Sequence, residues 1–302
     1  MAMALFIAIA LTVSIASSAN EQATTAKRPH ATYVVSPSGN DWGPGTAERP
    51  WRTLRRADRA ARPGSTIVLR RGAYGERGRE THLRGDGLMW RSALGERAFL
   101  RGKHYLDGAG SRFTRLTFDG PTGDVDGNGC NDESVLVDIR GYGVRIDHSE
   151  VRKSRGHAGI YVSEFPRGVR IDNNWIHDNG CFGDQETENH DHGIYFASGS
   201  GWITDNLIER NYSRGISLHY EPSHVIVENN RILRNGRQGI LVDTDEGGIR
   251  IANNLIAYNG YQSGNDHEVA GIAYVRGDDV ELIDNVFREN IGGPVSGVPD
   301  GP

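Results

Sequence analysis

The sequence predicts an all-β protein built as a solenoid of the parallel β-helix type. From residue 134 onward one pattern recurs, in which a short run such as "GIYFA" is followed by a run such as "GWITDNLIERN". Short alternating strands that repeat every roughly 20–30 residues are typical of coils that stack on each other and share one core. The 40 glycines among 302 residues fit the many turns that such coils require.

The spacing within each repeat is nearly constant. The glycine of the "GI" step and the asparagine that follows it are separated by 15, 13, 15, 15 and 14 residues. The glycines are Gly159, Gly193, Gly215, Gly239 and Gly271, and the asparagines are Asn174, Asn206, Asn230, Asn254 and Asn285. Because stacked amides can hydrogen-bond along such a turn and Asn tolerates the left-handed backbone, we interpret the asparagines as structural.

The spacing between repeats varies, and it varies at one corner. Asn211 and Gly215 are 4 residues apart, whereas Asn179 and Gly193 are 14 apart. The extra length therefore falls on the turn just before each "GI" strand. Insertions on one face of a solenoid usually mark the binding face, so we expect the functional site there.

The N-terminal part is predicted to cover the first coil. The stretch from residue 33 to about 75 reads as a strand, a Gly/Pro turn, an amphipathic helix near Trp51–Ala61 and the strand "TIVLR". A solenoid exposes its first coil unless another element covers it, and this helix is the natural cap. We therefore expect a single domain over residues 33–302.

The first residues predict export. The apolar run "LFIAIALTVSIA" is too short to span a membrane comfortably and ends in small residues, although "MAMA" before it has no Lys or Arg. We interpret residues 1–19 as a signal peptide rather than a retained anchor and residues 20–32 as a linker, so that the mature protein is extracellular or periplasmic and free of the membrane. A formal net charge of -5 argues against a nucleic-acid partner.

The opening "YVVSPSGND…PWRTLRRA…PGSTIVLRRGAY", followed by coils of the form "GI-x-V…I-x-NN-x-I", resembles the secreted right-handed parallel β-helix proteins of the pectate lyase-like superfamily. The resemblance covers most of residues 33–290. It implies right-handed coils of three strands, with the asparagine turn between the second and third strands and substrate along the outer face of the first-strand sheet. The superfamily includes polysaccharide lyases, glycoside hydrolases, epimerases and proteins without demonstrated catalysis, so the fold alone does not fix the activity.

Period-two alternation sorts the residues of the first strands. One set is predicted to point inward: Ile160, Val162, Ile194, Phe196, Ile216, Leu218, Ile240, Val242, Ile272 and Tyr274. Two columns are predicted to point outward: Tyr161, Tyr195, Ser217, Leu241 and Ala273 in one, and Ser163, Ala197, His219, Asp243 and Val275 in the other. Since neighbouring rungs stand about 4.8 Å apart, we expect His219 to contact Asp243 and Tyr161 to lie beside Tyr195.

The segment "NHDH", residues 189–192, is expected on the longest loop at the mouth of a cleft, exposed and beside Arg214 and Tyr195. For each residue taken alone, a solvated loop side chain is the alternative. The candidate catalytic residues are His192, Arg214, His219 and Tyr195, with Lys153 as a further candidate base. The candidate substrate-binding residues are Tyr161, Asp243, His157, His190 and Asp191.

These residue types favour a polysaccharide lyase acting on a uronate-containing glycan. A lyase needs a cation for the uronate carboxylate, a base for the C5 proton and a proton donor for the leaving oxygen, all of which His, Arg, Lys and Tyr can supply. A glycoside hydrolase needs two carboxylates about 5–10 Å apart. Asp243 has no acid beside it in its column, and Asp138, which we align with Ser163, lies four rungs away. A hydrolase and a non-catalytic glycan-binding protein remain the alternatives.

Two further features lie on the variable corner. The run "DVDGNG" places Asp124, Asp126 and Asn128 like the start of a calcium loop, but Val135 stands where the full pattern requires Glu. Calcium is therefore the one cofactor that the sequence indicates, with a plain turn as the alternative. Cys130 and Cys181 are the two cysteines, and in an exported protein they predict a disulfide.

Overall fold

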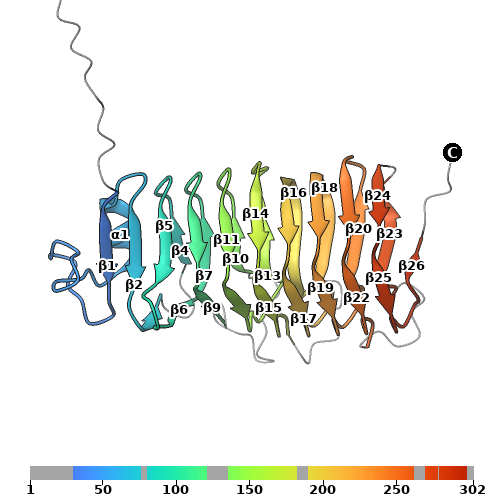
Figure 1. Ribbon diagram of the computed structural model, residues 1–302, viewed down its shortest axis with the longest axis horizontal. Helices are drawn as coiled ribbons and strands as arrows, with labels where there is room; N and C mark the ends of the chain where they lie inside the picture. Colours follow the sequence, from blue (N-terminus) through green and yellow to red (C-terminus); the bar gives the residue numbers. More distant parts are fainter. Residues whose placement is uncertain are drawn as a thin grey trace, which may run out of the picture.

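The chain winds into a right-handed parallel β-helix, shown in Figure 1. This computed structural model describes residues 30–75, 80–120, 135–181, 190–261, 269–277 and 279–297. Each complete coil contributes a first, a second and a third strand, and strands of the same kind pair in parallel with those of the neighbouring coils. The predicted signal peptide lies outside the described residues. Among the described residues, no helix is long and apolar enough to span a membrane.

The first and second strands form one 17-stranded sheet, because two long strands run through both positions. These are β16 (His192–Thr204) and β18 (Ile216–Glu228). The other first strands are β4 (Glu80–Leu83), β7 (Lys103–Leu106), β10 (Val135–Ile139), β13 (Ala158–Val162), β20 (Ile240–Thr244), β23 (Ile272–Arg276) and β26 (Val295–Ser296). The other second strands are β1 (Thr32–Val35), β2 (Thr66–Leu69), β5 (Met89–Ser92), β8 (Arg112–Thr114), β11 (Arg145–Asp147), β14 (Val169–Asp172), β21 (Ile249–Ala252) and β24 (Val280–Ile283).

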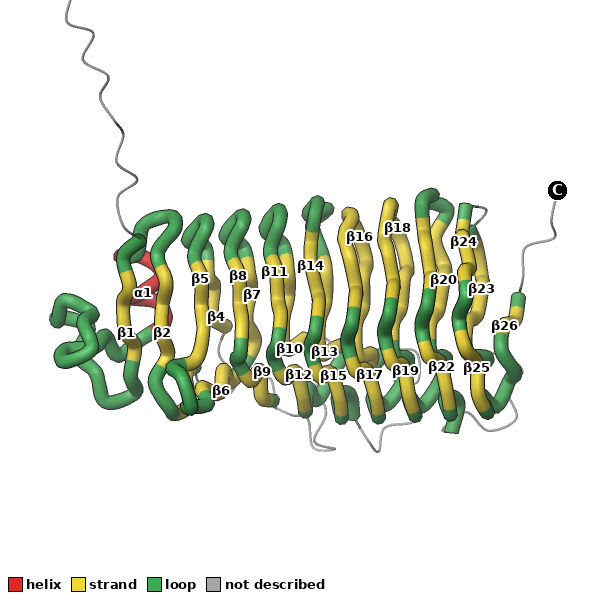
Figure 2. The backbone as a smooth tube through the Cα atoms, in the orientation of Figure 1, coloured by secondary structure: helices red, strands yellow, loops and turns green. Residues whose placement is uncertain are grey.

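The third strands form a separate nine-stranded sheet. They are β3 (Gly72–Tyr74), β6 (Ala98–Arg101), β9 (Thr117–Asp119), β12 (Glu150–Arg152), β15 (Trp175–His177), β17 (Leu207–Glu209), β19 (Arg231–Leu233), β22 (Leu255–Ala257) and β25 (Val286–Arg288). In Figure 2 the turns that join first to second strands run along the upper edge, and the third strands lie at the lower edge.

The one helix among the described residues, α1 (Leu54–Ala60), lies at the N-terminal end of the solenoid (Figure 1). It begins later than the predicted Trp51 because Thr53 is its N-cap, with the hydroxyl accepting a hydrogen bond from the Arg56 backbone. Leu54 and Ala57 face the core and are buried. Its role as a cap and the domain limits stay predictions.

The predicted inward residues form the core. Every member of the set from Ile160 to Tyr274 is buried and belongs to one continuous hydrophobic cluster. Burial of each such aliphatic side chain contributes about 1.5–3 kcal/mol, so the stacked first strands are a main source of stability. The alternation used to place the candidate site is therefore confirmed.

Asparagine side chains run through the solenoid in two ladders of amide hydrogen bonds of 2.9 to 3.1 Å. The first is the predicted one, from Asn174 to Asn285. The second was not predicted and contains Asn179, Asn211, Asn235, Asn259 and Asn290. In both ladders the residue just before each amide is left-handed, with φ between 47° and 61°: Asn173, Asp205, Asn229, Asn253 and Asp284 before the first, and Asp178, Arg210, Arg234, Tyr258 and Glu289 before the second. The sequence interpretation was wrong on this point, because the ladder amides bond and their neighbours make the turn.

Candidate functional site

Three side chains on successive first strands form a hydrogen-bonded chain. The Tyr195 hydroxyl lies 2.8 Å from Nδ1 of His219, and Nε2 of His219 lies 3.2 Å from Oδ2 of Asp243. The strand register places His219 directly opposite Asp243, as predicted from the rung spacing. A phenol, an imidazole and a carboxylate joined in this order have the arrangement of a nucleophile or acid, its base and the group that orients the base.

The row of hydrogen-bonded side chains extends to β23, where the strand register shifts. Between Val242 and Asp243 the pairing slips, so that Asp243 lies opposite Arg276. The prediction of Val275 at this position was wrong because an extra residue enters the pairing there. Arg276 donates through Nε to Asp243 at 2.6 Å and lies 3.0 Å from Asp245. The bulge thus brings a guanidinium to the end of the chain.

Aromatic rings surround Tyr195 on this face. Tyr161 lies across from Tyr195 with ring centroids 5.2 Å apart, as predicted. His157 stacks on Tyr195 at 4.9 Å and on His190 at 4.6 Å. His192 meets the Tyr195 ring edge-on at 5.2 Å. The structure thus brings together the four aromatic or imidazole side chains that the sequence placed around Tyr195.

Burial within this cluster differs from the prediction. His192 and Asp191 are 1% and 0% exposed, so they are not exposed loop residues. His192 is the first residue of β16, and its backbone N–H donates to the His157 carbonyl, which explains why the sheet covers it. Tyr195 is 4% exposed and belongs to a small hydrophobic cluster on the outer face, separate from the main core. The accessible part of the site is instead formed by His190, His219 and residues that the sequence did not indicate.

Two of those residues are Tyr220 and Arg276. Tyr220 is 58% exposed and stacks on His219 with centroids 4.0 Å apart. Strict alternation would turn Tyr220 inward, but its φ of 79° leaves the strand conformation and directs the ring outward. Gln238 is buried, and its side-chain carbonyl accepts from Nε of Arg214 at 2.9 Å. No sequence signal marks the bulge or the positive φ.

The surroundings set the protonation states. Burial lowers the pKa of His219, and Arg214 and Arg276 lower it further, while Asp243 opposes them. Burial also lowers the pKa of His157 to about 4 and that of His192 well below the ordinary value, with a contribution from Arg214 in the case of His192. Burial raises the pKa of Tyr195. At neutral pH the imidazoles of His157, His192 and His219 are therefore neutral and the Tyr195 phenol is protonated.

Other predicted residues lie apart from this cluster. Lys153 is exposed and adopts a φ of 58° at the corner after β12, and its role stays a prediction. Asp138 pairs in register with Tyr161, not with Ser163, so the predicted alignment was one column off. Its carboxylate is buried, accepting from Ser163 at 2.6 Å and from Arg140 at 2.9 Å. Asp138 is thereby occupied by structural partners.

The predicted calcium and disulfide residues lie largely outside the described ranges. Asp124, Asp126, Asn128 and Cys130 fall in the segment from 121 to 134, so calcium binding stays a prediction. The described part of the chain holds no group of three or more His, Cys, Asp or Glu side chains suited to a metal ion. Cys181 is buried and is not a free cysteine, and its pairing with Cys130 stays a prediction.

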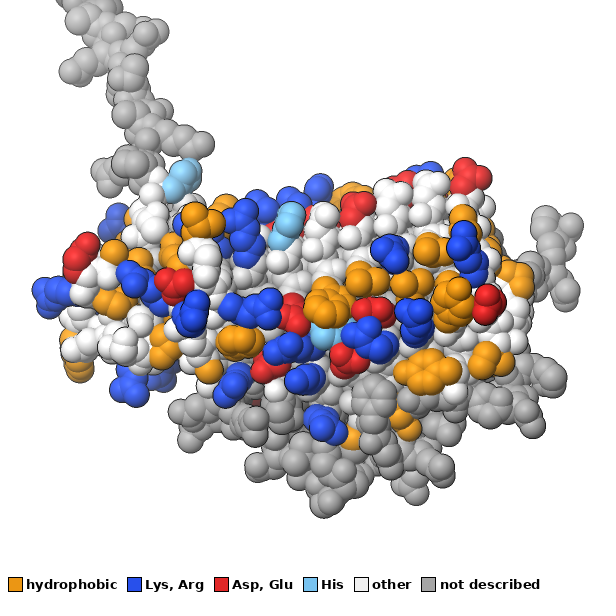
Figure 3. Space-filling model, turned by 60° about the horizontal axis from the view of Figure 1, so that its bottom comes forward, with side chains coloured by type: hydrophobic (Ala, Val, Ile, Leu, Met, Phe, Trp, Pro, Cys, Tyr) orange, Lys and Arg blue, Asp and Glu red, His pale blue; other side chains and the backbone are white. Residues whose placement is uncertain are grey.

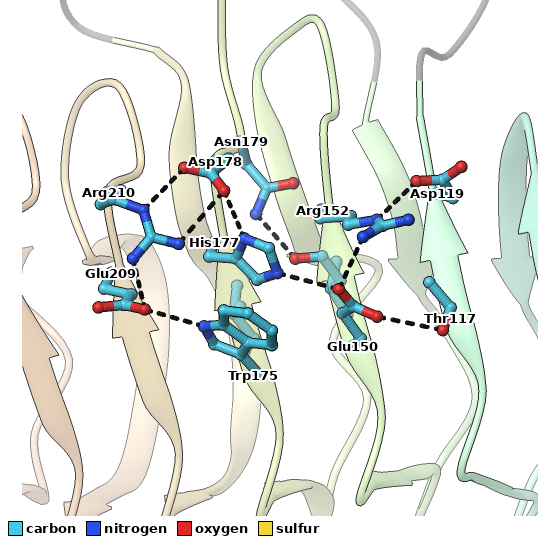
Figure 4. A network of polar contacts seen from close by, with 12 residues as sticks. Thr117, Asp119, Glu150, Arg152, Trp175, His177, Asp178, Asn179, Glu209 and Arg210 are labelled. Atoms are coloured by element: carbon cyan, nitrogen blue, oxygen red, sulfur yellow. Dashed lines mark hydrogen bonds and ion pairs between the residues drawn. The ribbon is translucent and has the colours of Figure 1, made fainter.

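A second polar cluster lies on the third-strand sheet (Figure 4). His177 lies between Asp178, at 2.6 Å from Nδ1, and Glu150, at 3.2 Å from Nε2. Arg152 and Arg210 continue the ion pairs to the neighbouring coils. Figure 3, with the lower side of the molecule turned forward, shows basic and acidic side chains intermingled across this side. Since each charge has an opposite partner, we interpret this cluster as structural.

Comparison with known proteins agrees with this architecture. The family model described as "Right handed beta helix region" matches residues 125–297. The chain belongs to this family. A segment of 71 residues is 37% identical to the uncharacterized protein YwoF of Bacillus subtilis (strain 168), but it spans only 23% of this chain and 15% of that protein.

Several solved structures share the fold. The pectate lyase Pel9A superposes with a TM-score of 0.64 at 14% identity, over 87% of this chain and 79% of that chain. A PL6 family alginate lyase, AlyGC, gives 0.57 at 18% identity, over 90% of this chain and 41% of that chain. XylC, solved with xylose, gives 0.53 at 13% identity, over 83% and 69%. The resemblance to the pectate lyase-like β-helix proteins is thus confirmed at the level of the fold.

Proposed function

We propose that this β-helix protein is a polysaccharide lyase that cleaves a uronate-containing glycan by β-elimination. The observation that carries the proposal is the chain from Tyr195 through His219 to Asp243 on the outer face of the first strands. The similarity in fold to a pectate lyase and an alginate lyase supports the same substrate class. The predicted export of the chain is consistent with a polymeric substrate outside the cytoplasm.

The hydrogen-bond directions follow from the protonation states. Because the pKa of Tyr195 is raised and that of His219 is lowered, the phenol donates to Nδ1, and Nε2–H donates to Asp243. Asp243 then fixes the tautomer of His219 and stabilises the imidazolium that forms when the phenol proton moves to it.

In the proposed reaction, Tyr195 transfers its proton to His219 while its oxygen takes the C5 proton of the uronate. The electron pair of the C5–H bond forms the C4–C5 double bond, and the C4–O bond breaks. The leaving oxygen receives a proton from Tyr195, and His219 returns the proton it had held. The net change is the movement of one proton from C5 to the leaving oxygen, so the protein ends as it began.

The substrate carboxylate needs a cation, since its negative charge otherwise opposes removal of the C5 proton. Arg214 and Arg276 both lie close enough to His219 to lower its pKa. The Arg276 side chain is 48% exposed, so it can meet a substrate from solvent. The exposed ring of Tyr220 beside His219 offers a stacking surface for the sugar.

A lyase fits better than a hydrolase. Asp243 is bound by His219 and Arg276, and its direct neighbours in the register of the adjacent strands are these two residues. Asp245, which Arg276 contacts through Nη1, is exposed. The arrangement therefore offers proton transfer by Tyr and His rather than a pair of carboxylates that face one bond.

The test is a screen of pectate, alginate and glycosaminoglycans for the ultraviolet absorbance of the unsaturated uronate product. The wild type should form this product from at least one polymer, and Tyr195→Phe and His219→Asn should each lower kcat at least about 100-fold. His148→Asn is the matched control, because His148 is exposed on the asparagine-turn side and has a φ of 47° that Asn accepts. New reducing ends without this absorbance, or retention on a polymer without turnover, would refute the lyase assignment.

A further inference from the structure

A hollow is lined by residues of the turns that join first to second strands. These turns run along the upper edge in Figure 2. Its volume is about 660 Å³, which is within the range of small-molecule sites. It is built by successive coils, from the turn before β11 to the turn after β20. Glu221, one of its lining residues, follows Tyr220 directly in the chain, so the hollow adjoins the candidate site.

One wall of the hollow consists of two exposed aromatic rings. Tyr142 and Phe165 are 59% and 56% exposed, although large rings are usually covered in a stable fold. Their turns are neighbours, because the Gly143 N–H donates to the Arg167 carbonyl at 2.8 Å. Two rings on adjacent coils therefore border the same space.

The turn that carries Phe165 is held in an unfavourable conformation. Glu164 and Phe165 have φ values of 62° and 57°, in the left-handed region that bulky residues avoid. Each such residue costs on the order of 1–3 kcal/mol and persists only where its surroundings enforce it. Here Ser198 accepts from the Phe165 N–H at 2.9 Å, and Arg140 pairs with Glu164 at 3.2 Å. These contacts direct the Phe165 ring to the hollow rather than to the core.

The lining next to Phe165 includes a glycine, Gly199, where two coils approach closely. Gly199 has a φ of 85°, and a Cβ there would lie 2.0 Å from the Pro166 carbonyl oxygen. No other residue type fits this position, because the Pro166 backbone of the neighbouring coil approaches too closely for a Cβ. Ser200, the next residue, adds only a small hydroxyl.

The rest of the lining is polar and holds more carboxylates than guanidinium groups. Glu221 and Glu246 contribute two carboxylates, and Arg167 is the one permanently cationic side chain of the lining. Carboxylates accept hydrogen bonds from hydroxyl groups strongly, and a π-face packs well against apolar C–H groups. Two carboxylates against one guanidinium disfavour a second anion.

We propose that this hollow binds an uncharged pyranose, with one sugar face on Phe165 and Tyr142 and its hydroxyls donating to Glu221 and Glu246. The link to the reaction rests on the proposed function: the preferred polymer then carries neutral sugars beside or on its uronate backbone. The binding itself does not depend on turnover. The hollow is thus a specificity site distinct from the Tyr195 chain.

The test is calorimetric titration of the full protein with neutral xylo-, manno- and galacto-oligosaccharides and with oligogalacturonates. At least one neutral series should bind more tightly than the oligogalacturonates, and Phe165→Asn should weaken that binding about tenfold or more. Asn is chosen because it accepts the left-handed backbone. Tyr258→Asn is the matched control, since Tyr258 is also an exposed aromatic residue with a φ of 61°, but it lies on the turn after the third strand β22 and not on the turns that border the hollow, so binding should stay unchanged.

Failure of this proposal and failure of the lyase assignment give different results. If no unsaturated product forms but neutral sugars bind and this binding is lost in Phe165→Asn, the sugar-binding proposal is supported and the lyase assignment is not. If the protein turns over a polymer but binds no neutral sugar, only the sugar-binding proposal is overturned. Equal binding in Phe165→Asn and the wild type also overturns it. Tighter binding of oligogalacturonates in a manner that depends on Phe165 also overturns it, because the charge argument is then wrong.

Discussion

Removal of one amide from the middle of the first asparagine ladder should destabilise the whole solenoid. We consider Asn206→Ala, because Asn206 is 1% exposed and lies between Asn174 and Asn230. Its Oδ1 accepts from the backbone N–H and the side-chain amide of Asn174 at 2.9 and 3.1 Å. Its Nδ2 donates to the Ile171 carbonyl at 2.8 Å and to Asn230 at 3.0 Å.

The magnitude follows from these contacts. Four hydrogen bonds are lost, each with a net contribution of about 0.5–1.5 kcal/mol. The buried backbone N–H of Asn174 loses the acceptor that it has in the ladder, and a buried donor without an acceptor costs about 1–3 kcal/mol. Because these contributions overlap, we expect a loss of about 3–5 kcal/mol in the free energy of unfolding, against a typical total of about 5–15 kcal/mol.

The assay is urea unfolding followed by far-ultraviolet circular dichroism for the wild type, Asn206→Ala and Asn253→Gly. Asn253 is the matched control: it precedes ladder residue Asn254, is exposed, and has a φ of 55° that Gly accepts freely. Its substitution should change stability by less than about 0.5 kcal/mol. If Asn206→Ala loses less than about 1 kcal/mol, or if both variants lose the same amount, the ladder does not stabilise the coils as argued.

Three further predictions concern titration, polar networks and metal. Burial lowers the pKa of His104 to about 4, below an unfolded value near 6.5, so the unfolded state binds more protons between these values and stability falls as pH drops through this window. Between pH 7 and pH 5 the free energy of unfolding should fall by about 2 kcal/mol less in His104→Leu than in the wild type, as measured by urea unfolding at both pH values. His177→Gln should lower the melting temperature and leave turnover within about twofold. His219→Asn should instead lower turnover and leave the melting temperature nearly unchanged. Loss of turnover in His177→Gln would place the reaction on the third-strand sheet. If Asp126 and its neighbours hold calcium, Ca²⁺ should raise the melting temperature of the wild type but not of Asp126→Asn; no rise in the wild type would leave the segment a plain turn.

Most of the fold could be predicted because a solenoid repeats its local rules. The spacing between the glycines and asparagines fixed the length of each coil, and alternation in runs such as "GIYFA" fixed which residues face the core. The same regularity gave the pairing of His219 with Asp243 and of Tyr161 with Tyr195. These pairs follow from register alone, which is set once every coil has the same phase.

The parts of the site that were missed are those where the repeat is broken. Because of the bulge, Arg276 and not Val275 lies opposite Asp243. The positive φ of Tyr220 directs outward a side chain that alternation places inward. Burial of His192 was also missed, because its loop position predicted exposure while its backbone joins the sheet. Each of these departures depends on backbone geometry that no residue pattern in one sequence specifies.

The clusters around His219 and His177 differ in what occupies the ring nitrogens, and this difference is the reason why we assign the proposed reaction to His219. Both nitrogens of His177 are held by carboxylates, and its side chain is 5% exposed beneath Trp175 at 3.8 Å, so its imidazole has no position left for a reacting proton. His219 uses one nitrogen for a carboxylate and the other for a phenol, which is itself an acid and a base, and its side chain is 30% exposed. In the proposed reaction a proton can therefore move between His219 and the Tyr195 phenol, which exchanges protons with the bound molecule, whereas at His177 it can only remain between fixed charges. Under the proposed function, reactivity on this scaffold is expected to follow from the partner of the imidazole rather than from the number of charged residues around it.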